Sequence, residues 1–274
     1  MISFIFLLVL IFLVFVPYFT SDFLDIRQRK ENEENYQKLL KEELVSKEAK
    51  QKTEKKMYLT GKFDPLQRED FVLIPTQYVL GGNKMYLRKE TLDAFLKMAE
   101  IAKEDKIDLK IASATRNFDY QKDIWNKKWS GTTIVDGEDL SKSIPDEQER
   151  FKKILEYSAV PGTSRHHWGT DIDISNVNLE YFKTKAGKKE YDWLTKNAPL
   201  FGFCQTYNLK GSVRPTGYNE EKWHWSYLPL SRTFSQEYKN LIKDEDIKGF
   251  LGDEYVPVLN LINDYVLSIN LECL

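Results

Sequence analysis

Two residue types that build many protein sites are scarce in this chain. Its 274 residues include only three histidines and two cysteines, Cys204 and Cys273. Two cysteines are too few for a disulfide framework or for a CxxC-type metal site. One bridge between them would suit an exported protein, but the sequence leaves their pairing open.

An excess of charge of either sign is also lacking. The chain has 40 basic and 42 acidic residues, which gives a formal net charge of -2. This balance excludes a strongly basic surface, so we expect no nucleic-acid partner. The composition, 42% hydrophobic and 14% aromatic, is sufficient for a packed core and excludes a disordered chain.

One long apolar run is present, at residues 1–19. Its length matches the roughly 20 residues that cross a bilayer as a helix, so residues 1–20 are predicted to be a transmembrane anchor or signal segment. No Lys or Arg precedes the run and no small-x-small cleavage pattern follows it, which favours an uncleaved anchor. The basic residues Arg27, Arg29 and Lys30 follow the run, and by the positive-inside rule alone they would keep that side cytoplasmic.

The next segment, residues 21–56, is dominated by charge. It has 19 charged residues in 36 and contains neither glycine nor proline. Three Glu-to-Lys pairs lie four residues apart in the order that stabilises a helix, namely Glu34 to Lys38, Glu43 to Lys47 and Glu48 to Lys52. We predict a charged helical stalk here, with a solvated linker as the alternative.

The remainder, residues 57–274, is predicted to be one domain. Apolar spacing predicts helices at 89–103, from about 145 through 155, at 188–197, at 236–243 and at 256–268, and strands at 107–113 and 171–177. A mixture of helices with few strands indicates the α+β class. The two strands are expected to share a small, mainly antiparallel sheet with helices packed on one side.

All three histidines fall in two short segments, residues 164–173 and 221–225, and each segment also has a carboxylate. Two histidines and an aspartate with an open fourth position are ligands typical of a hydrolytic zinc site. Bound zinc lowers the pKa of its water to roughly 7, and a further carboxylate must then accept the proton. A few nitrogen-rich ligands favour Zn²⁺ over Mg²⁺ or Ca²⁺, which prefer oxygen shells.

The two segments resemble the VanY-type zinc D-alanyl-D-alanine carboxypeptidase family. That signature is S-x-H-x-x-G-x-x-x-D followed later by E-x-W-H. This chain has both halves in the right order, with Ser164, His166, Gly169, Asp173, Glu221, Trp223 and His224. The resemblance extends to residues 113–121 and 193–203, covering most of 57–227, and it implies a D-Ala-D-Ala metallopeptidase (hedgehog-like) fold.

The resemblance implies a role for each matching residue. His166, Asp173 and His224 would hold Zn²⁺, and Glu221 would be the general base. Arg116 would hold the scissile carbonyl or the terminal carboxylate of the substrate. Gln121, Ser164 and Trp223 would contact the substrate, although Gln121 could instead be an exposed polar residue on a helix beginning near Asn117, and Trp223 could be a core residue.

Two neighbouring residues leave alternatives open. Asp171 replaces a small or apolar residue of the family pattern, and it shares a strand face with Asp173, so it could be an outer partner or a competing ligand. His167 could pack or form a hydrogen bond instead of binding metal. A structural zinc site closed by Cys204 is a further alternative.

We therefore expect a zinc-dependent D,D-carboxypeptidase that removes the terminal D-alanine from peptidoglycan stem peptides. The alternatives are an endopeptidase or L,D-carboxypeptidase with the same zinc chemistry, and a non-catalytic cell-wall binding module. The expected location is the cell envelope, with the N-terminal segment in the cytoplasmic membrane and the catalytic domain outside the cytoplasm.

Overall fold

The computed structural model describes residues 2–274, with side chains described from Asp25 onward. The chain divides into two compact units, Met1–Thr53 and Glu54–Leu274. Helix α1 (Ile2–Leu59) provides the first unit. Its side chains from Asp25 to Thr53 are exposed, as expected for a solvated, charged helix.

Within residues 25–274, no helix combines the length and apolar character that crossing a membrane requires. The predicted anchor at residues 1–20 lies outside the residues whose side chains are described.

The second unit mixes short strands with helices. Its strands are β1 (Phe71–Leu73), β2 (Tyr86–Arg88), β3 (Ile111–Ser113), β4 (Asp171–Ile174), β5 (Phe203–Gln205) and β6 (His224–Tyr227). Its helices are α2 (Lys89–Glu104), α3 (Phe118–Trp129), α4 (Leu140–Ser143), α5 (Glu147–Leu155), α6 (Lys185–Asn197) and α7 (Leu228–Leu241). Strands β1 and β2 form an antiparallel pair, and β3, β4, β6 and β5 form a four-stranded antiparallel sheet in that order. The prediction of an α+β fold with small antiparallel sheets is confirmed.

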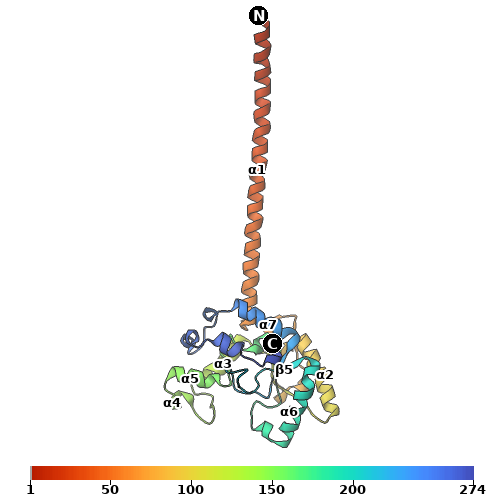
Figure 1. Cartoon of the computed structure of the whole chain (residues 1–274), viewed down its shortest axis with the longest axis vertical. Coiled ribbons are helices and arrows are strands. Elements are labelled where there is room, and N and C mark those ends of the chain that lie inside the picture. Colours follow the sequence, from red (N-terminus) through yellow and green to blue (C-terminus); the bar gives the residue numbers. More distant parts are fainter. Residues whose placement is uncertain (1) are drawn as a thin grey trace. The chain divides into compact units, whose positions relative to one another are not determined.

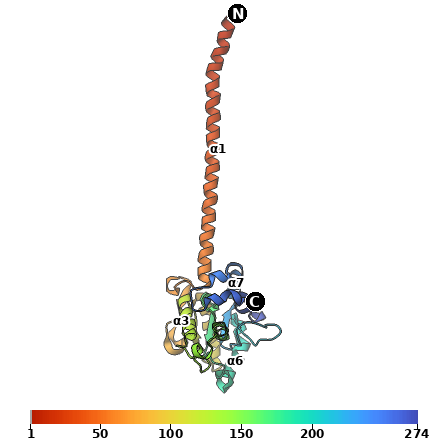
Figure 2. The same ribbon diagram turned by 90° about the vertical axis from the view of Figure 1, so that its left-hand side faces the viewer.

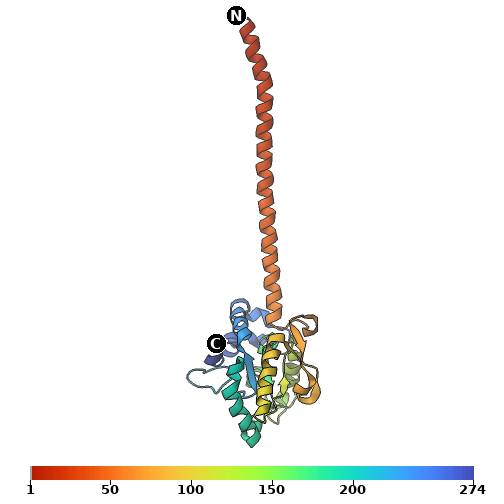
Figure 3. The same ribbon diagram turned by 90° about the vertical axis from the view of Figure 1, so that its right-hand side faces the viewer.

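Helices α2 and α6 cover one face of the four-stranded sheet. Ile172 and Ile174 of β4 share a buried cluster with Phe95 of α2 and Leu194 of α6. Each such buried side chain stabilises the fold by roughly 1.5–3 kcal/mol. Figure 1 shows α2 and α6 on one side of this unit and α3, α4 and α5 on the other, and Figure 3 shows α2 and α6 in the foreground.

A second buried cluster joins α3, α5 and α7. Trp125 of α3 packs edge-on against Phe151 of α5, with ring centroids 4.9 Å apart. Figure 2 shows α3 in the foreground, opposite the side covered by α2 and α6. The four-stranded sheet therefore has one apolar face on α2 and α6, while its other face is available for polar residues.

The last turn of α1 is part of this second unit. The Tyr58 hydroxyl donates to the carbonyl of Trp168 at 2.6 Å, and the Trp168 indole donates to the carbonyl of Leu59 at 3.1 Å. Both side chains of α1 are buried. These contacts fix the chain entering the unit against the segment that carries His166.

Several predicted boundaries are wrong. The strand predicted at 107–113 is paired only from Ile111, and the strand predicted at 171–177 ends at Ile174 because Ser175 adopts a left-handed conformation (φ 61°). The last two predicted helices also differ: α7 begins at Leu228, and 256–268 is no α-helix, because Pro257 and the positive φ of Asn260 interrupt it.

Candidate metal centre and substrate cavity

Strands β4 and β6 place two of the predicted ligands opposite each other. Asp173 pairs with His224, and Asp171 pairs with Ser226. Because side chains alternate along a strand, Ile172 enters the core under α2 while both aspartates point to the other face. The spacing D-I-D thus presents two carboxylates to one buried polar region.

His166 comes from a 3-10 helix, Arg165–Trp168, that precedes β4. This helix ends at Gly169, which is left-handed (φ 72°). A Cβ atom at Gly169 would lie 2.4 Å from Cε1 of Phe71, so no larger residue fits without movement of that ring. The glycine of the motif therefore allows the turn that carries the chain from His166 into β4.

The three predicted ligands meet at one point. Asp173 Oδ1 lies 3.4 Å from His166 Nε2 and 3.2 Å from His224 Nδ1. The candidate ligand atoms of the three residues all lie within 4.8 Å of one another. Within the described part of the chain, His166 Nε2 and Asp173 Oδ1 are buried and make no hydrogen bond of good geometry.

Buried polar atoms without partners are costly, and a bound cation would compensate both of these. Two imidazole nitrogens and one carboxylate oxygen are ligands that suit Zn²⁺. The residues present therefore fit the predicted zinc ion.

Asp171 is an outer partner of this centre. Its Oδ1 atom lies 3.0 Å from His224 Nε2 and accepts a hydrogen bond of 3.0 Å from Arg165 Nε, while Oδ2 accepts one of 2.6 Å from Thr170. Burial alone would raise the pKa of Asp171, but the charge of Arg165 and the contact with His224 hold it below its usual range. A carboxylate on the far nitrogen of a ligating imidazole fixes the orientation of the ring.

The other ring nitrogens are fixed as well. His166 Nδ1 lies 2.9 Å from the carbonyl of Ala114. Burial would lower the pKa of His224, but Asp171 and Asp173 raise it to about 9 in the metal-free protein. Metal binding at His224 requires the neutral form of the ring.

Glu221 lies beside the centre but outside the group of three. Its Oε2 atom is 3.4 Å from His224 Nδ1, and its side chain is buried. Burial raises the pKa of Glu221 to about 8 in the metal-free protein, and a dication bound beside it would lower that pKa again. A carboxylate beside the centre is placed to accept a proton and to return it.

His167 points away from the centre. Its Nε2 atom accepts a hydrogen bond of 3.0 Å from the backbone N–H of Gly162, so Nδ1 carries the proton and donates to the carbonyl of Arg116 at 2.6 Å. Burial lowers the pKa of His167 to about 3, which keeps the ring neutral. This neutral imidazole joins the segments that carry Arg116 and His166.

A cavity of about 860 Å³ opens over the centre, and it is lined by the three candidate ligands and Glu221. Arg116, Gln121, Ser164 and Trp223 line it too, so the structure brings every predicted site residue to one place. The backbone N–H of Arg116 donates to the carbonyl of His166 at 3.3 Å. Its Nε atom is buried and has no hydrogen-bond partner among the described residues.

Gln121 and Trp223 are both buried. Gln121 donates to the carbonyl of Ala159 at 2.7 Å, and its Oε1 atom has no partner within the described residues. It is therefore not the exposed residue of the alternative interpretation. Trp223 stacks on Phe182, with centroids 6.3 Å apart, and also lines the cavity, so it is both a packing residue and a wall residue.

Sequence reasoning missed other residues of the cavity, chiefly Lys128, Ser158 and Tyr218. Lys128 lies seven residues after Gln121, on the same face of α3, and this spacing is the only sequence signal that could have indicated it. Tyr218 is buried in a segment without a recognisable motif.

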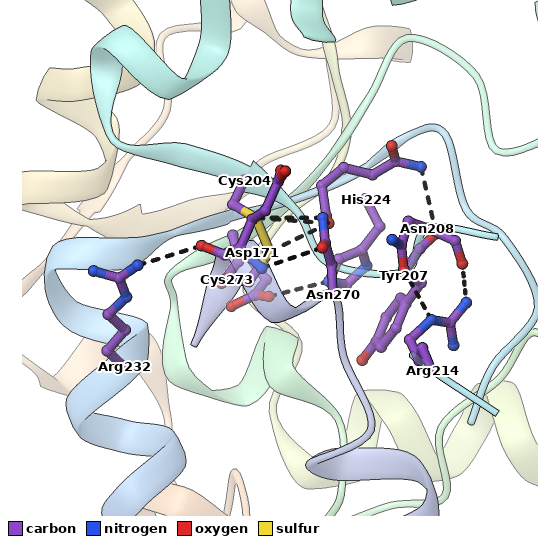
Figure 4. The surroundings of a disulfide bond; sticks show 12 residues. Asp171, Cys204, Tyr207, Asn208, Arg214, His224, Arg232, Asn270 and Cys273 are labelled. Atoms are coloured by element: carbon purple, nitrogen blue, oxygen red, sulfur yellow. Dashed lines mark hydrogen bonds and ion pairs between the residues drawn. A yellow bond between two sulfur atoms is a disulfide. The ribbon is translucent and has the colours of Figure 1, made fainter. Parts of the chain in front are cut away.

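The two cysteines form a disulfide bond, with Cα atoms 5.6 Å apart. Cys204 lies in β5 opposite Ser226 of β6, and Figure 4 shows the bridge together with Asp171 and His224. The bridged sulfur is not a zinc ligand, and Cys204 does not belong to the candidate metal group. The alternative of a structural zinc closed by Cys204 is therefore wrong.

Asp173 and His224 on neighbouring strands, His166 on the preceding 3-10 helix and a buried glutamate beside them form an arrangement typical of zinc peptidases. Comparison with known proteins identifies the family. The sequence model of VanY, described as D-alanyl-D-alanine carboxypeptidase, matches residues 84–230, more than half of the chain. The chain belongs to the VanY family.

Two individual relatives have low sequence identity to this chain. YodJ of Bacillus subtilis (strain 168), provisionally named a carboxypeptidase, is 28% identical over 201 residues, 70% of this chain and 62% of that protein. A D-alanyl-D-alanine carboxypeptidase of Enterococcus faecalis (strain ATCC 700802 / V583) is 25% identical over 179 residues, 63% and 61% of the two chains. The chain thus spans about three fifths of the length of these relatives.

Two solved structures are similar to this chain. The LD-carboxypeptidase LdcB is 26% identical with a TM-score of 0.46, covering 67% of this chain and 81% of LdcB. VanYB, solved in complex with D-alanine-D-alanine, is 23% identical with a TM-score of 0.45, covering 63% and 91%.

Proposed function

We propose that this protein is a zinc-dependent D,D-carboxypeptidase that removes the terminal D-alanine from peptidoglycan stem peptides. The observation that carries the proposal is the convergence of His166, Asp173 and His224 beside Glu221, in the lining of a cavity that Arg116 also lines. Membership of the VanY family supports the substrate class.

Zinc, when bound by the two histidines and Asp173, supplies Lewis-acid chemistry that polarises a carbonyl and acidifies water. The side chains have distinct tasks around it. Glu221 accepts the proton of the attacking water and returns it to the leaving amine, a cycle that suits a buried carboxylate. Arg116 offers a fixed positive charge to the oxygen of the scissile carbonyl as negative charge develops there.

The bond that is cut is tested with three defined substrates. The purified zinc protein is incubated with a stem pentapeptide, a stem tetrapeptide and a cross-linked dimer, and the products are identified by mass. Release of one D-alanine from the pentapeptide alone is the expected result. Cleavage of the tetrapeptide instead would identify an L,D-carboxypeptidase, and cleavage of the dimer an endopeptidase.

A non-catalytic binding module is the remaining alternative. It would cut none of the three substrates in the presence of zinc. Glu221→Gln is the matched control, because activity that survives in this variant would indicate a contaminating peptidase.

We further propose that residues 1–20 anchor the protein in the cytoplasmic membrane and that the catalytic domain lies outside the cytoplasm. Two observations support this location: the apolar run at residues 1–19 and the Cys204–Cys273 disulfide, because disulfides persist in oxidising compartments. Digestion of the domain by protease added to intact spheroplasts is expected, and complete protection until lysis would contradict the proposal.

A further inference from the structure

One wall of the cavity carries a cation, Lys128, whose charge no carboxylate of the described residues balances at close range. Helix α3 contributes Gln121 and Lys128 to this wall. They lie two helical turns apart, and Trp125 between them is anchored by a hydrogen bond of 2.8 Å to the carbonyl of Leu251. The part of α3 between the two polar groups is therefore held against the segment of Leu251.

The loop after α5 completes this wall. Ala159 accepts the hydrogen bond of Gln121, and the hydroxyl of Ser158 accepts one from Lys128 Nζ. Ser158 and Ala159 also line the cavity. Lys128 is thus held in place by a neutral partner and does not extend into solvent as its neighbour does.

Among the residues that the structure describes, no carboxylate lies within ion-pairing distance (4.0 Å) of Lys128. Asp136 and Glu221 act on it only from farther away, and Asp136 is paired with Lys153 at 2.8 Å. The adjacent Lys127, by contrast, is half-exposed and pairs with Asp123 at 2.6 Å.

The surroundings of Lys128 favour an incoming anion. Burial lowers the pKa of Lys128, and the nearby positive charge of Arg116 lowers it further. A partly desolvated ammonium without a counter-ion is costly, and an anion bound in the cavity would compensate it.

We propose that Lys128 binds the terminal carboxylate of the peptide substrate and so makes the site select a free chain end. The proposal rests on the proposed carboxypeptidase function. Such a substrate brings two negative centres into the cavity: the oxygen of the scissile carbonyl, which gains charge during the reaction, and the free carboxylate one residue further on. Arg165, a third basic residue of the lining, is already paired with Asp171, which leaves Arg116 and Lys128 to match them.

The contacts of the two cations divide these tasks. Arg116 is bonded through its backbone to the segment of His166 and His167, so it belongs to the metal centre, where the carbonyl oxygen must lie. Lys128 is attached to the cavity wall through Ser158, and in the described part of the chain no hydrogen bond joins it to His166, Asp173 or His224. It is therefore the cation available for the terminal carboxylate.

The test compares two peptides that differ only in that carboxylate. One is a stem pentapeptide ending in D-alanyl-D-alanine, and the other is the same peptide with a C-terminal carboxamide. For Lys128→Gln, we expect kcat/KM on the free acid to fall about 10- to 100-fold, mainly through KM, the loss typical of a hydrogen bond to a charged group. Cleavage of the carboxamide should change less than about threefold.

Two further variants control for folding and for charge. Lys127→Gln removes the neighbouring exposed cation of the same helix and should leave both rates unchanged. Lys128→Arg keeps a cation on the wall and should retain the preference for the free acid. Two results for Lys128→Gln would overturn the proposal: an equal loss of kcat/KM on both peptides, or no loss on either. An equal loss is also what we expect if Lys128 binds another carboxylate of the stem.

A binding experiment separates this proposal from the proposed function. Calorimetric titration of both peptides into the zinc-loaded Glu221→Gln protein, with and without Lys128→Gln, requires no turnover. Tighter binding of the free acid that disappears with Lys128→Gln supports the carboxylate site even if a different bond proves to be cut. Identical affinities for the two peptides in the Glu221→Gln protein would overturn it, whatever the activity.

Discussion

Asp173 and His224 lie directly opposite each other on β4 and β6, with Oδ1 of the aspartate 3.2 Å from Nδ1 of the histidine. A cross-strand pair is among the most rigid ways to position two side chains, because the ladder of backbone hydrogen bonds fixes both Cα atoms. Only His166 comes from an irregular segment. The accuracy of the centre therefore depends on how firmly the turn at Gly169 is held.

Metal binding and proton transfer are expected to separate in two variants. His224→Ala removes a candidate ligand and should lose both zinc and activity. Glu221→Gln should keep zinc near one per chain while hydrolysis falls at least about 100-fold, the usual weight of a general base. Metal analysis measures the zinc content, and a D-alanine release assay measures the activity. Loss of zinc from Glu221→Gln would instead indicate that Glu221 is a ligand.

Asp171→Asn is expected to weaken zinc binding about 10- to 100-fold, the usual effect of removing an outer partner of a ligating histidine. The asparagine keeps the shape of the side chain but removes the charge that faces His224 and Arg165. Competition with a chelator of known affinity measures the change. Asp108→Asn, an exposed carboxylate, is the control, and equal zinc affinity in the two variants would refute the role of Asp171.

Gly169→Ala should destabilise the fold and reduce zinc content. The added methyl would meet the ring of Phe71 at 2.4 Å in a backbone conformation with positive φ. Gly137→Ala is a matched control, because Gly137 also has a positive φ (85°) but nothing lies within 4 Å of its added Cβ. Urea unfolding of both variants should show that the free energy of unfolding falls by at least about 1 kcal/mol more for Gly169→Ala than for Gly137→Ala. Equal losses would mean that the positive φ alone causes the destabilisation.

The ion pair between Lys56 and Asp246, 2.6 Å long, predicts a pH-dependent stability. Burial would raise the pKa of Asp246, but the hydrogen bond and charge of Lys56 lower it overall. A carboxyl group whose pKa is lowered by folding stabilises the folded protein at pH values above the pKa of that group in the unfolded chain, about 3.9. This stabilisation is lost as the pH falls through the pKa of the group in the folded protein.

Asp246→Asn should therefore be less stable than the unmodified protein by a constant amount between about pH 5 and 8, with the difference shrinking below about pH 4. Unfolding by urea at several pH values, with zinc present or absent in both proteins alike, measures it. A difference that grows on acidification would contradict the assignment.

Local sequence patterns predicted the candidate metal group well because its members lie in two short motifs. His166 and Asp173 are seven residues apart and Glu221 and His224 three, so a strand and a tight turn determine most of their geometry. Lys128 and the burial of Gln121 were not predictable in this way. Their partners, Ser158 and Ala159, are 30 and 38 residues away, so only tertiary packing defines the wall they form.

The Cys204–Cys273 bridge closes a loop of chain that contains both Glu221 and His224. Within that loop, Leu209 and Val213 are 71% and 66% exposed, in a segment without helix or strand where a protease could cut. A single cut there would leave two fragments that stay covalently joined and migrate as one species on a gel until they are reduced. The nicked protein would keep His166 and Asp173 on one fragment and His224 on the other, with the disulfide holding the halves of the site together.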